Sequence, residues 1–452
     1  MPDANADARR ANRVGLDGFN LALSRGTGVA TYGHALSQAL RGLGRSIDVV
    51  YGVDVPRTAP ESLRETLFFA RLAERRSASE PPAKTTLRRA MRQLFLSPSV
   101  REPLEVAVTG RVVREGAARM PAFDRLFTLG GLFHLGARHF RRYGRFMTVR
   151  LPDPPAIMHW TYPLPVRLEG ALNLYTVHDL VPLRLPFTTL DDKVYHHRLL
   201  SQCLAAGDHI VTVSEASRRD ILDFFPIDPD RVTNTYQAVM PSGAEPDEDT
   251  LATHLRALFD LRPQGYFLFV GAIEPKKNVG RLIEAYLAAE LQTPLVLAGP
   301  SAWLAEDELR LLAGAHGARP PGVERIRRID YLPAGQLRTL MRGARAVLFP
   351  SLYEGFGLPA LEAMSLGAPV MASNAAALPE VVGQAGLAVD PYDVAAMTQA
   401  LRRMDGDEAL RARLSAAGRE RAKSFSMTAY QNRLASLHAR LLGAPDLSRR
   451  EA

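Results

Sequence analysis

Two separate series of alternating strand-like and helix-like segments run along this chain, and they constrain its fold more than any other feature. The first series predicts strands at residues 14–19, 46–51, 156–160, 171–177 and 209–213. The second predicts strands at residues 266–272, 295–298 and 346–350. Strands that alternate with helices build parallel sheets covered by helices. Because a single core stops growing at about 250–300 residues, the 452 residues should form two such α/β domains.

The boundary between the two domains is expected near residue 241. The stretch PSGAEPDEDT at 241–250 is polar, acidic and without apolar periodicity, which is typical of linkers. We therefore expect a Rossmann-like domain over residues 1–240, a linker over 241–262 and a second Rossmann-like domain over 263–424. Residues 425–452 contain a final amphipathic helix, which the periodicity places at 426–442.

Positive charge is concentrated in one part of the first domain. Residues 84–150 carry fourteen Lys or Arg against four Asp or Glu, while the whole chain has a net charge of +8. Residues 57–150 lack the strand–helix rhythm, so we expect a mostly helical insertion beside the sheet. Peripheral contact with an anionic membrane through residues 84–150 is the functional interpretation, and a solvated helical face is the alternative. No aromatic-rich motif accompanies the arginines, so we expect no nucleic-acid partner.

The remaining bulk features favour a cytoplasmic protein. Residues 1–13 are polar and resemble no secretory signal, and no stretch reaches the roughly 18 apolar residues of a spanning helix. The single cysteine, Cys203, allows no internal disulfide, in keeping with a reducing compartment. We expect a location in the cytoplasm, with peripheral attachment to the cytoplasmic face of the inner membrane as a further possibility.

The segment VLFPSLYEGFGLPALEAMSLGAPV at 347–370 carries the strongest sign of a binding site. It reads as a buried strand, a loop and a helix, and Gly355 and Gly357 allow the loop backbone to approach a ligand closely. The N-terminus of the helix is a site for phosphate. Glu354 in the loop and Glu362, expected in the first helical turn, bracket that site. Carboxylates repel phosphate, so we expect them to accept hydrogen bonds from hydroxyls on either side of it, one on a sugar and one on a ribose. Together these features predict a nucleotide-sugar site.

The run from Glu354 through Glu362 resembles the E-x7-E motif of family-4 (group 1) glycosyltransferases. Further segments resemble the same family in the same order along the chain: GTGVATY (26–32), VHDLVPL (177–183), VTVSEASRRDIL (211–222), FLFVGAIEPKKNVGRLIEAY (267–286) and LVLAGP (295–300). The resemblance implies the GT-B fold, in which two Rossmann-like domains face each other across a cleft. It also implies that the N-terminal domain binds the acceptor, that the C-terminal domain binds the nucleotide sugar, and that the last helix crosses back to the N-terminal domain.

The resemblance further implies a role for each matching residue around the donor. Glu354 would bind hydroxyls of the donor sugar, and Glu362 would bind the ribose. The diphosphate would lie on the loop that starts at Gly355, held by the backbone amides of Phe356, Gly357 and Leu358.

Outside this loop, the resemblance implies five more site residues. Lys277 matches the basic residue that neutralises charge on the leaving group, and Lys276 would replace an arginine whose position is Ala272 here. His178 would hydrogen-bond the reacting region of the donor. Gly26 and Gly28 would let an acceptor loop pass close to the diphosphate.

We therefore predict a retaining hexosyltransferase that moves mannose from GDP-mannose to a lipid-linked saccharide in exopolysaccharide or O-antigen synthesis. The donor rests on similarity around EPKKN and VHDLVPL to bacterial mannosyltransferases, and the retaining outcome rests on the resemblance alone. UDP-glucose or UDP-galactose as donor would preserve every motif. A non-catalytic protein that binds through the basic segment is the alternative outside enzymes. No cofactor or metal is expected, and the adjacent acids at 191–192 are interpreted as the start of a helix.

Overall fold

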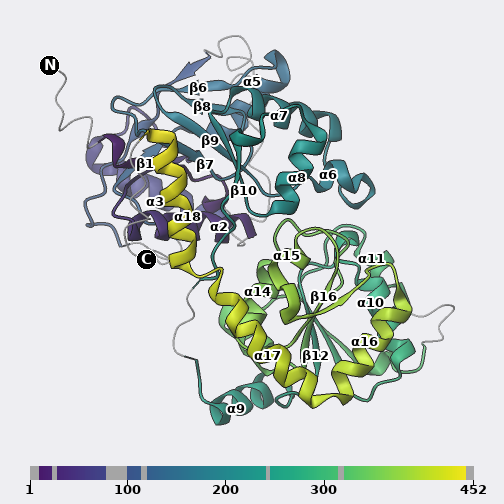
Figure 1. Cartoon of the computed structure of the whole chain (residues 1–452). Coiled ribbons are helices and arrows are strands. Elements are labelled where there is room, and N and C mark those ends of the chain that lie inside the picture. The colour runs from purple at the N-terminus through teal and green to yellow at the C-terminus, as the bar shows by residue number, and fades with distance from the viewer. Residues whose placement is uncertain are drawn as a thin grey trace.

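The computed structural model describes residues 10–22, 28–77, 99–113, 120–240, 245–313 and 320–443. These residues form two α/β domains, shown in Figure 1 with the first domain above the second. Each domain has a central, largely parallel sheet with helices on both faces. Strands such as β7 (Ile157–Trp160) and β12 (Phe267–Val270) are buried at every position, as expected for parallel strands covered on both sides.

The first domain is built on an eight-stranded sheet with the order β11-β10-β9-β7-β1-β2-β5-β4. Neighbouring strands are parallel except at the β4 edge. The remaining strands of this sheet are β1 (Arg13–Asp17), β2 (Ser46–Tyr51), β4 (Leu104–Glu105), β5 (Arg125–Thr128), β9 (Leu172–Val177), β10 (His209–Thr212) and β11 (Val232–Asn234). A small parallel sheet of β3 (Val100–Arg101), β6 (Met147–Val149) and β8 (Val166–Leu168) lies beside it. The main helices are α2 (Gly28–Gly42), α3 (Glu61–Ser77), α5 (Leu132–Tyr143), α6 (Val181–Arg184), α7 (Lys193–Ala206) and α8 (Glu215–Phe224).

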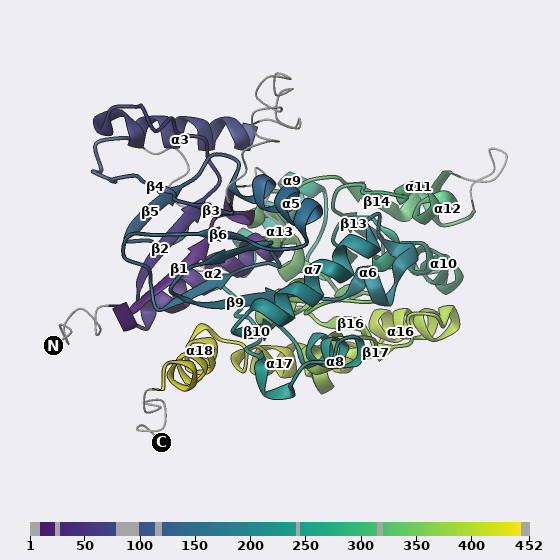
Figure 2. The same ribbon diagram turned by 90° about the horizontal axis from the view of Figure 1, so that it is seen from above.

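The prediction of a mostly helical insertion over residues 57–150 is wrong for much of its described part. Strands β4 and β5 extend the main sheet, and β3 and β6 belong to the small sheet. These strands have two to four residues each, too short for a period-2 pattern to stand out from the surrounding arginines. Figure 2 shows α3, β4 and β5 at the end of the first domain that lies away from α10 and α16 of the second.

The second domain has a six-stranded, fully parallel sheet with the order β14-β13-β12-β15-β16-β17. Its other strands are β13 (Leu295–Ala298), β14 (Ile326–Ile329), β15 (Ala346–Phe349), β16 (Val370–Ser373) and β17 (Leu387–Val389). The helices include α10 (Val279–Ala289), α13 (Ala334–Gly343), α14 (Leu358–Ser365), α15 (Leu378–Val382), α16 (Val394–Gly406) and α17 (Glu408–Lys423). In the expected linker, α9 (Glu248–Phe259) packs into the core of this domain, because Leu251, Leu255 and Phe259 lie on one face of the helix.

The last helix, α18 (Met427–Leu442), lies on the first domain, as Figures 1 and 2 show. Its buried residues Tyr430, Leu434 and Leu437 belong to the same core as residues of α2. The side chain of Arg433 donates to the Thr235 carbonyl at 2.7 Å. The chain therefore passes between the domains a second time just after α17, so that α18 holds them together independently of the first connection.

None of the helices in the described ranges combines the length and apolar composition needed to cross a lipid bilayer.

Candidate active site

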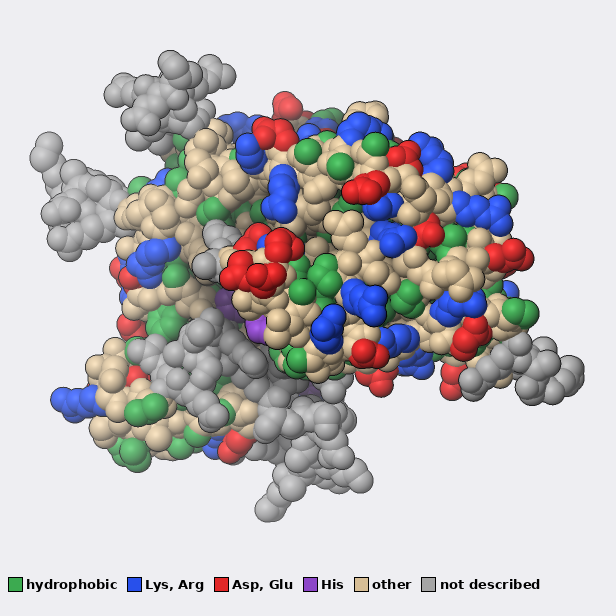
Figure 3. Space-filling model, turned by 90° about the horizontal axis from the view of Figure 1, so that it is seen from below, with side chains coloured by type: hydrophobic (Ala, Val, Ile, Leu, Met, Phe, Trp, Pro, Cys, Tyr) green, Lys and Arg blue, Asp and Glu red, His purple; other side chains and the backbone are tan. Residues whose placement is uncertain are grey.

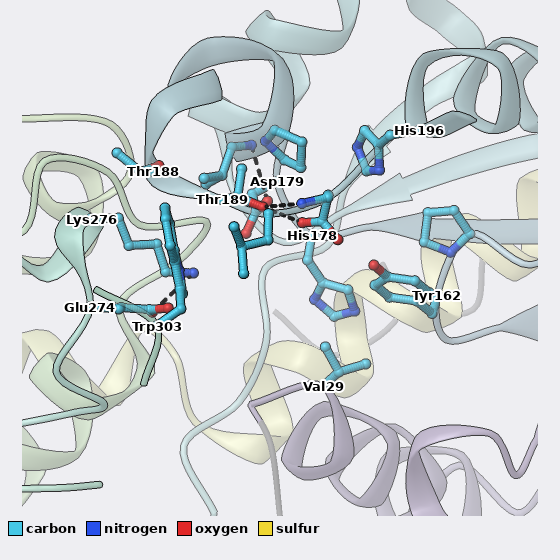
Figure 4. A pocket seen from close by; sticks show the side chains of 15 residues that line it. Val29, Tyr162, His178, Asp179, Thr188, Thr189, His196, Glu274, Lys276 and Trp303 are labelled. Carbon is cyan, nitrogen blue, oxygen red and sulfur yellow. Dashed lines mark hydrogen bonds and ion pairs between the residues drawn. The ribbon is translucent and has the colours of Figure 1, made fainter. Parts of the chain in front are cut away.

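A cavity of about 480 Å³ lies between the two domains, within the range of small-molecule sites. Loops at the carboxyl ends of parallel strands bring its walls together, as expected for open α/β sheets. The first domain contributes Tyr162 after β7, His178 and Asp179 after β9, and the segment 188–191. The second domain contributes Glu274 and Lys276 after β12, and Trp303 after β13. Figure 4 shows these two groups of side chains facing the same space.

His178 is held by aromatic neighbours and one backbone hydrogen bond. Its ring meets Tyr32 edge-on, with centroids 4.9 Å apart, and stacks against Tyr162 at 6.4 Å. The Nε2 atom lies 2.8 Å from the Thr161 carbonyl oxygen, which can only accept, so Nε2 carries the proton. Burial lowers the pKa of His178 despite the Thr161 hydrogen bond and the nearby Asp179. His178 is therefore a neutral imidazole near pH 7, and its free Nδ1 can accept a hydrogen bond from a sugar hydroxyl.

Glu354 and Lys277 form a largely buried ion pair, with Lys277 Nζ 2.7 Å from Glu354 Oε1. The Ser351 hydroxyl donates to the same oxygen at 2.7 Å. Burial would raise the pKa of Glu354, but Lys277, Lys276 and these hydrogen bonds outweigh it and lower the pKa. Glu354 is therefore an oriented carboxylate, and its second oxygen remains available to a ligand hydroxyl.

Lys276 and Lys277 are kept beside the β15 loop by the residue that follows them. The buried Asn278 side chain donates to the carbonyls of Pro350 at 2.9 Å and Pro391 at 2.7 Å, and does not cap α10 as its position in the sequence suggests. Lys276 Nζ lies 3.4 Å from a Glu274 oxygen. Burial lowers the pKa of Lys276, but Asp179, Glu274 and Glu354 raise it further, so the net shift is upward. This cation can neutralise a leaving diphosphate.

Gly355 lets the two domains approach closely. A Cβ atom at this position would lie 2.5 Å from the His178 carbonyl oxygen and 3.0 Å from Asp179 Cβ. The prediction that Gly355 makes room for a ligand is therefore incomplete, because its missing side chain first makes room for the backbone of His178. Gly357 has a φ of 97°, and a Cβ there would lie 2.7 Å from a Leu378 side-chain carbon.

Phe356 and Leu358 direct their side chains into the protein interior. Phe356 is buried against Tyr236, at 6.4 Å between ring centroids, and Phe425, at 5.6 Å. Leu358 begins α14 and is also buried. The backbone amides at 356–358 lie at the N-terminus of α14, where free N–H groups favour phosphate. The contact of these amides with the diphosphate stays a prediction.

Glu362 lies in the second turn of α14, one turn later than predicted, because the helix begins at Leu358. Burial raises the pKa of Glu362 to about 7, opposed only by the charge of Arg338. Unlike Glu354, Glu362 forms no ion pair with any described residue, which leaves its carboxylate available to a ligand. The ribose contact implied for Glu362 is compatible with this geometry and stays a prediction.

The predicted acceptor loop is described only in part. Gly26 lies outside the described residues. Gly28 is the first residue of α2, and a Cβ there would have no heavy atom of the described residues within 4 Å, so none of these residues requires glycine at this position. The next residue, Val29, lines the cavity.

Contacts between α8 and the second domain were not anticipated from the sequence. Both carboxylate oxygens of Glu380 accept hydrogen bonds at 2.9 Å, one from the Glu215 amide and one from the Ala216 amide, at the N-terminus of α8. Ser217 Oγ donates to the His178 carbonyl at 2.7 Å, and the Tyr353 hydroxyl donates to Asp220. The one sequence signal at this contact is the pair Pro379 and Glu380, which is typical of the first turn of a helix.

The charge of the described surface is mixed. Figure 3 shows Lys and Arg side chains interspersed with Asp and Glu on the face it presents. Within the Arg-rich segment, Arg125 pairs with the buried Asp48 at 2.5 Å and Arg150 pairs with Glu169 at 3.0 Å. Part of the local positive charge is therefore neutralised within the fold.

Comparisons with known proteins agree with this architecture. The family model described as glycosyl transferases group 1 matches residues 260–421. O-antigen chain mannosyltransferase B of Escherichia coli is 38% identical over 268 residues, which cover 58% of this chain and 68% of that protein. Serotype-specific mannosyltransferase WbdA of Escherichia coli is 31% identical over 271 residues, which cover 55% of this chain and 31% of WbdA. Sucrose-phosphate synthase from Thermosynechococcus elongatus has a similar structure, with a TM-score of 0.63, 19% identity and coverage of 95% and 99% of the two chains.

Two parallel-sheet domains that face each other across a cleft, with a basic loop and a glycine loop beside it, define the GT-B class of glycosyltransferases. The chain belongs to the group 1 glycosyltransferase family and is a glycosyltransferase.

Proposed function

We propose that this enzyme is a retaining mannosyltransferase that uses GDP-mannose and extends a lipid-linked saccharide in O-antigen or exopolysaccharide synthesis. The observation that carries the proposal is the 38% identity, over 268 residues, to a protein named O-antigen chain mannosyltransferase B. The donor, the lipid-linked acceptor and the retaining outcome are parts of the proposal.

The geometry supports a donor placed between the loop after β9 and the loop after β15. Glu354 would accept hydrogen bonds from sugar hydroxyls, and Nδ1 of His178 would accept one more. The diphosphate would lie between Lys276 and the N-terminus of α14. Negative charge that develops on the departing nucleoside diphosphate would be stabilised there by a fixed cation and by oriented amides.

The same geometry bears on the stereochemical outcome. A double-displacement mechanism requires a free carboxylate that attacks the anomeric carbon. The carboxylate of Glu354 is engaged by Lys277 and Ser351, which suits a binding role better than attack. We therefore favour a front-face transfer, in which an oxygen of the leaving phosphate takes the proton from the acceptor hydroxyl.

Attachment to the cytoplasmic face of a membrane is also proposed, through the described end of the Arg-rich segment. Arg141, Arg142 and Arg145 are exposed at the end of α5, and the Arg141 guanidinium lies 4.6 Å from the Tyr195 ring of α7. On the adjoining α6–α7 segment, Phe187, Leu190 and Val194 are 65%, 77% and 70% exposed. Cationic and apolar side chains together suit an anionic bilayer surface, where each Lys or Arg contributes about 1 kcal/mol. Because Leu190 also lines the cavity, a lipid-linked acceptor would enter directly from this surface.

The test is thermal unfolding of the protein and of Glu362→Ala with GDP, UDP, ADP and TDP. A nucleotide at 100 times its dissociation constant stabilises the folded state by about 2.7 kcal/mol. We expect GDP to stabilise the wild type selectively and the variant less. Selective stabilisation by UDP would replace the mannose donor with UDP-glucose or UDP-galactose, and no stabilisation by any nucleotide would refute the donor site.

A further inference from the structure

One wall of the cavity is rich in oxygen atoms and poor in cations. Among the described residues that line the cavity, Lys276 is the one Lys or Arg, and it is paired with Glu274 at 3.4 Å. Two more carboxylates, Asp179 and Asp191, line the side formed by the first domain. Three carboxylates thus face one ammonium group, so a bound group beyond the leaving phosphate meets a negative potential.

Two described cations close in sequence to residues of this wall, Lys193 and Arg184, are engaged elsewhere. Lys193 Nζ donates to the Thr189 carbonyl at 2.5 Å and does not line the cavity. Arg184 is held by Asp220 and Asp223, each at 2.7 Å. None of them is placed to bind a second phosphate in the cavity.

Two aromatic side chains bound the cavity from opposite domains. Trp303 is half-buried and lies beside Lys276 and Glu274, while Tyr162 lies beyond His178, as Figure 4 shows. Aromatic rings bury the C–H face of a pyranose while leaving its hydroxyls free for polar neighbours. Burial, together with Asp179 and Asp191, raises the pKa of Tyr162 to about 12, so its phenol keeps its proton and can donate.

His196 adds a neutral polar group to the same wall. Its Nε2 atom is buried and has no hydrogen-bond partner among the described residues. Burial lowers the pKa of His196 despite the nearby Asp179 and Asp191, so the ring is uncharged near pH 7. The nitrogen of an uncharged imidazole can donate a hydrogen bond to a hydroxyl or accept one from it, so a neutral ligand is enough to pair this nitrogen.

We propose that this wall is the acceptor subsite and that it selects an uncharged saccharide over a phosphorylated one. The pyranose packs on Trp303, and its hydroxyls donate to Asp179 and Asp191. A phosphomonoester in the same place would meet two carboxylates, and no free cation among the described residues that line the cavity, which disfavours it. The inference rests on the proposed transferase function and adds the chemical class of the acceptor. Since Trp303 belongs to the second domain, the subsite is complete only when the two domains are together.

Tryptophan fluorescence tests the subsite without requiring turnover. The chain has two tryptophans, and Trp160 is fully buried with its indole bonded to Asn173, so Trp303 is the accessible reporter. The probes are methyl α-mannobioside and the same disaccharide carrying a 6-phosphate, titrated with and without GDP. We expect the neutral probe to change the emission and reduce acrylamide quenching, with the phosphorylated probe binding at least about 10-fold more weakly. Trp303→Phe should remove most of the signal. Equal or tighter binding of the phosphorylated probe, or no response to the neutral one, would overturn the proposal.

Kinetics provide the matching control. Trp303→Ala should raise the acceptor KM about 10-fold or more and leave the dissociation constant of the nucleotide unchanged. Leu304→Ala changes an exposed neighbour that does not line the cavity, and it should leave both constants unchanged. An unaltered acceptor KM in Trp303→Ala would overturn the subsite. Failure of GDP to bind would count against the proposed donor, while the disaccharide titration without nucleotide would still decide the acceptor class.

Discussion

Glu362→Gln should make the unliganded enzyme more stable and its nucleotide binding weaker. The half-buried Glu362 has a pKa raised from 4.5 to about 7 by burial. A carboxyl group whose pKa is higher in the folded state than in the unfolded state destabilises the folded protein when it loses its proton. This cost is absent below about pH 4.5, grows as the pH rises and is complete above about pH 7.

The size of the effect follows from the same values. A pKa raised from 4.5 to about 7 corresponds to about 3 kcal/mol, at about 1.4 kcal/mol per tenfold change in the protonation equilibrium. Solvent screening of a partly exposed carboxylate reduces this to about 1–2 kcal/mol. For a domain of this size, about 1 kcal/mol moves the Tm by about 2–4 °C. Glu362→Gln should therefore unfold several degrees higher than the wild type at pH 8 and at the same temperature at pH 4.5.

Nucleotide binding should change in the opposite direction. Hydrogen bonds to a charged group contribute about 1.5–3 kcal/mol, so loss of the carboxylate should weaken nucleotide binding about 10- to 100-fold. The assay is thermal unfolding at pH 4.5 and pH 8, with and without the nucleotide that stabilises the wild type. Glu284→Gln on the exposed face of α10 is the control and should change neither quantity. An unliganded Glu362→Gln that is no more stable than the wild type at pH 8 would refute the reasoning.

Three more predictions follow from the contacts around the cleft. Glu354→Gln should lower kcat/KM at least about 100-fold in transfer assays, and a change confined to stability would argue for a structural role only. Glu380→Gln removes the carboxylate that holds the N-terminus of α8, so small-angle scattering should show a larger radius of gyration and transfer assays should show a higher donor KM. An unchanged radius of gyration would contradict this prediction. Treatment with EDTA should leave the rate unchanged, because Lys276 and the N-terminus of α14 are proposed to neutralise the leaving diphosphate in place of a metal ion. Loss of activity that Mg²⁺ or Mn²⁺ restores would show that reasoning to be wrong.

The contacts of α8 suggest how binding and closure are linked. Ser217 donates to the His178 carbonyl, and the missing side chain of Gly355 allows the same backbone to approach. Opening the cleft would therefore separate His178 from the loop that carries Glu354. This arrangement makes the donor site sensitive to the relative position of the domains, even though most of its implied residues belong to the second one.

Much of the fold could be predicted from local patterns. Apolar runs bounded by turn residues located β2 and β13 at their observed positions, and the strand–loop–helix at 346–365 within a residue or two. These patterns are short-range, because the pleat and the helical turn repeat within a few residues. The short strands β3 to β6 were not predicted, because two to four residues are too few to reveal the alternation of buried and exposed side chains that marks a strand.

The sequence by itself determined the two α/β domains, the glycine loop with its two glutamates and the resemblance to a glycosyltransferase family. Only the tertiary structure decided which other residues these residues contact. The approach of Gly355 to His178, the pairing of Lys277 with Glu354 and the convergence of Trp303 with Asp191 join positions 77 to 177 residues apart in the chain. Such contacts depend on strand order and on how the domains close. They follow from the packing of whole sheets and helices, which no local period records.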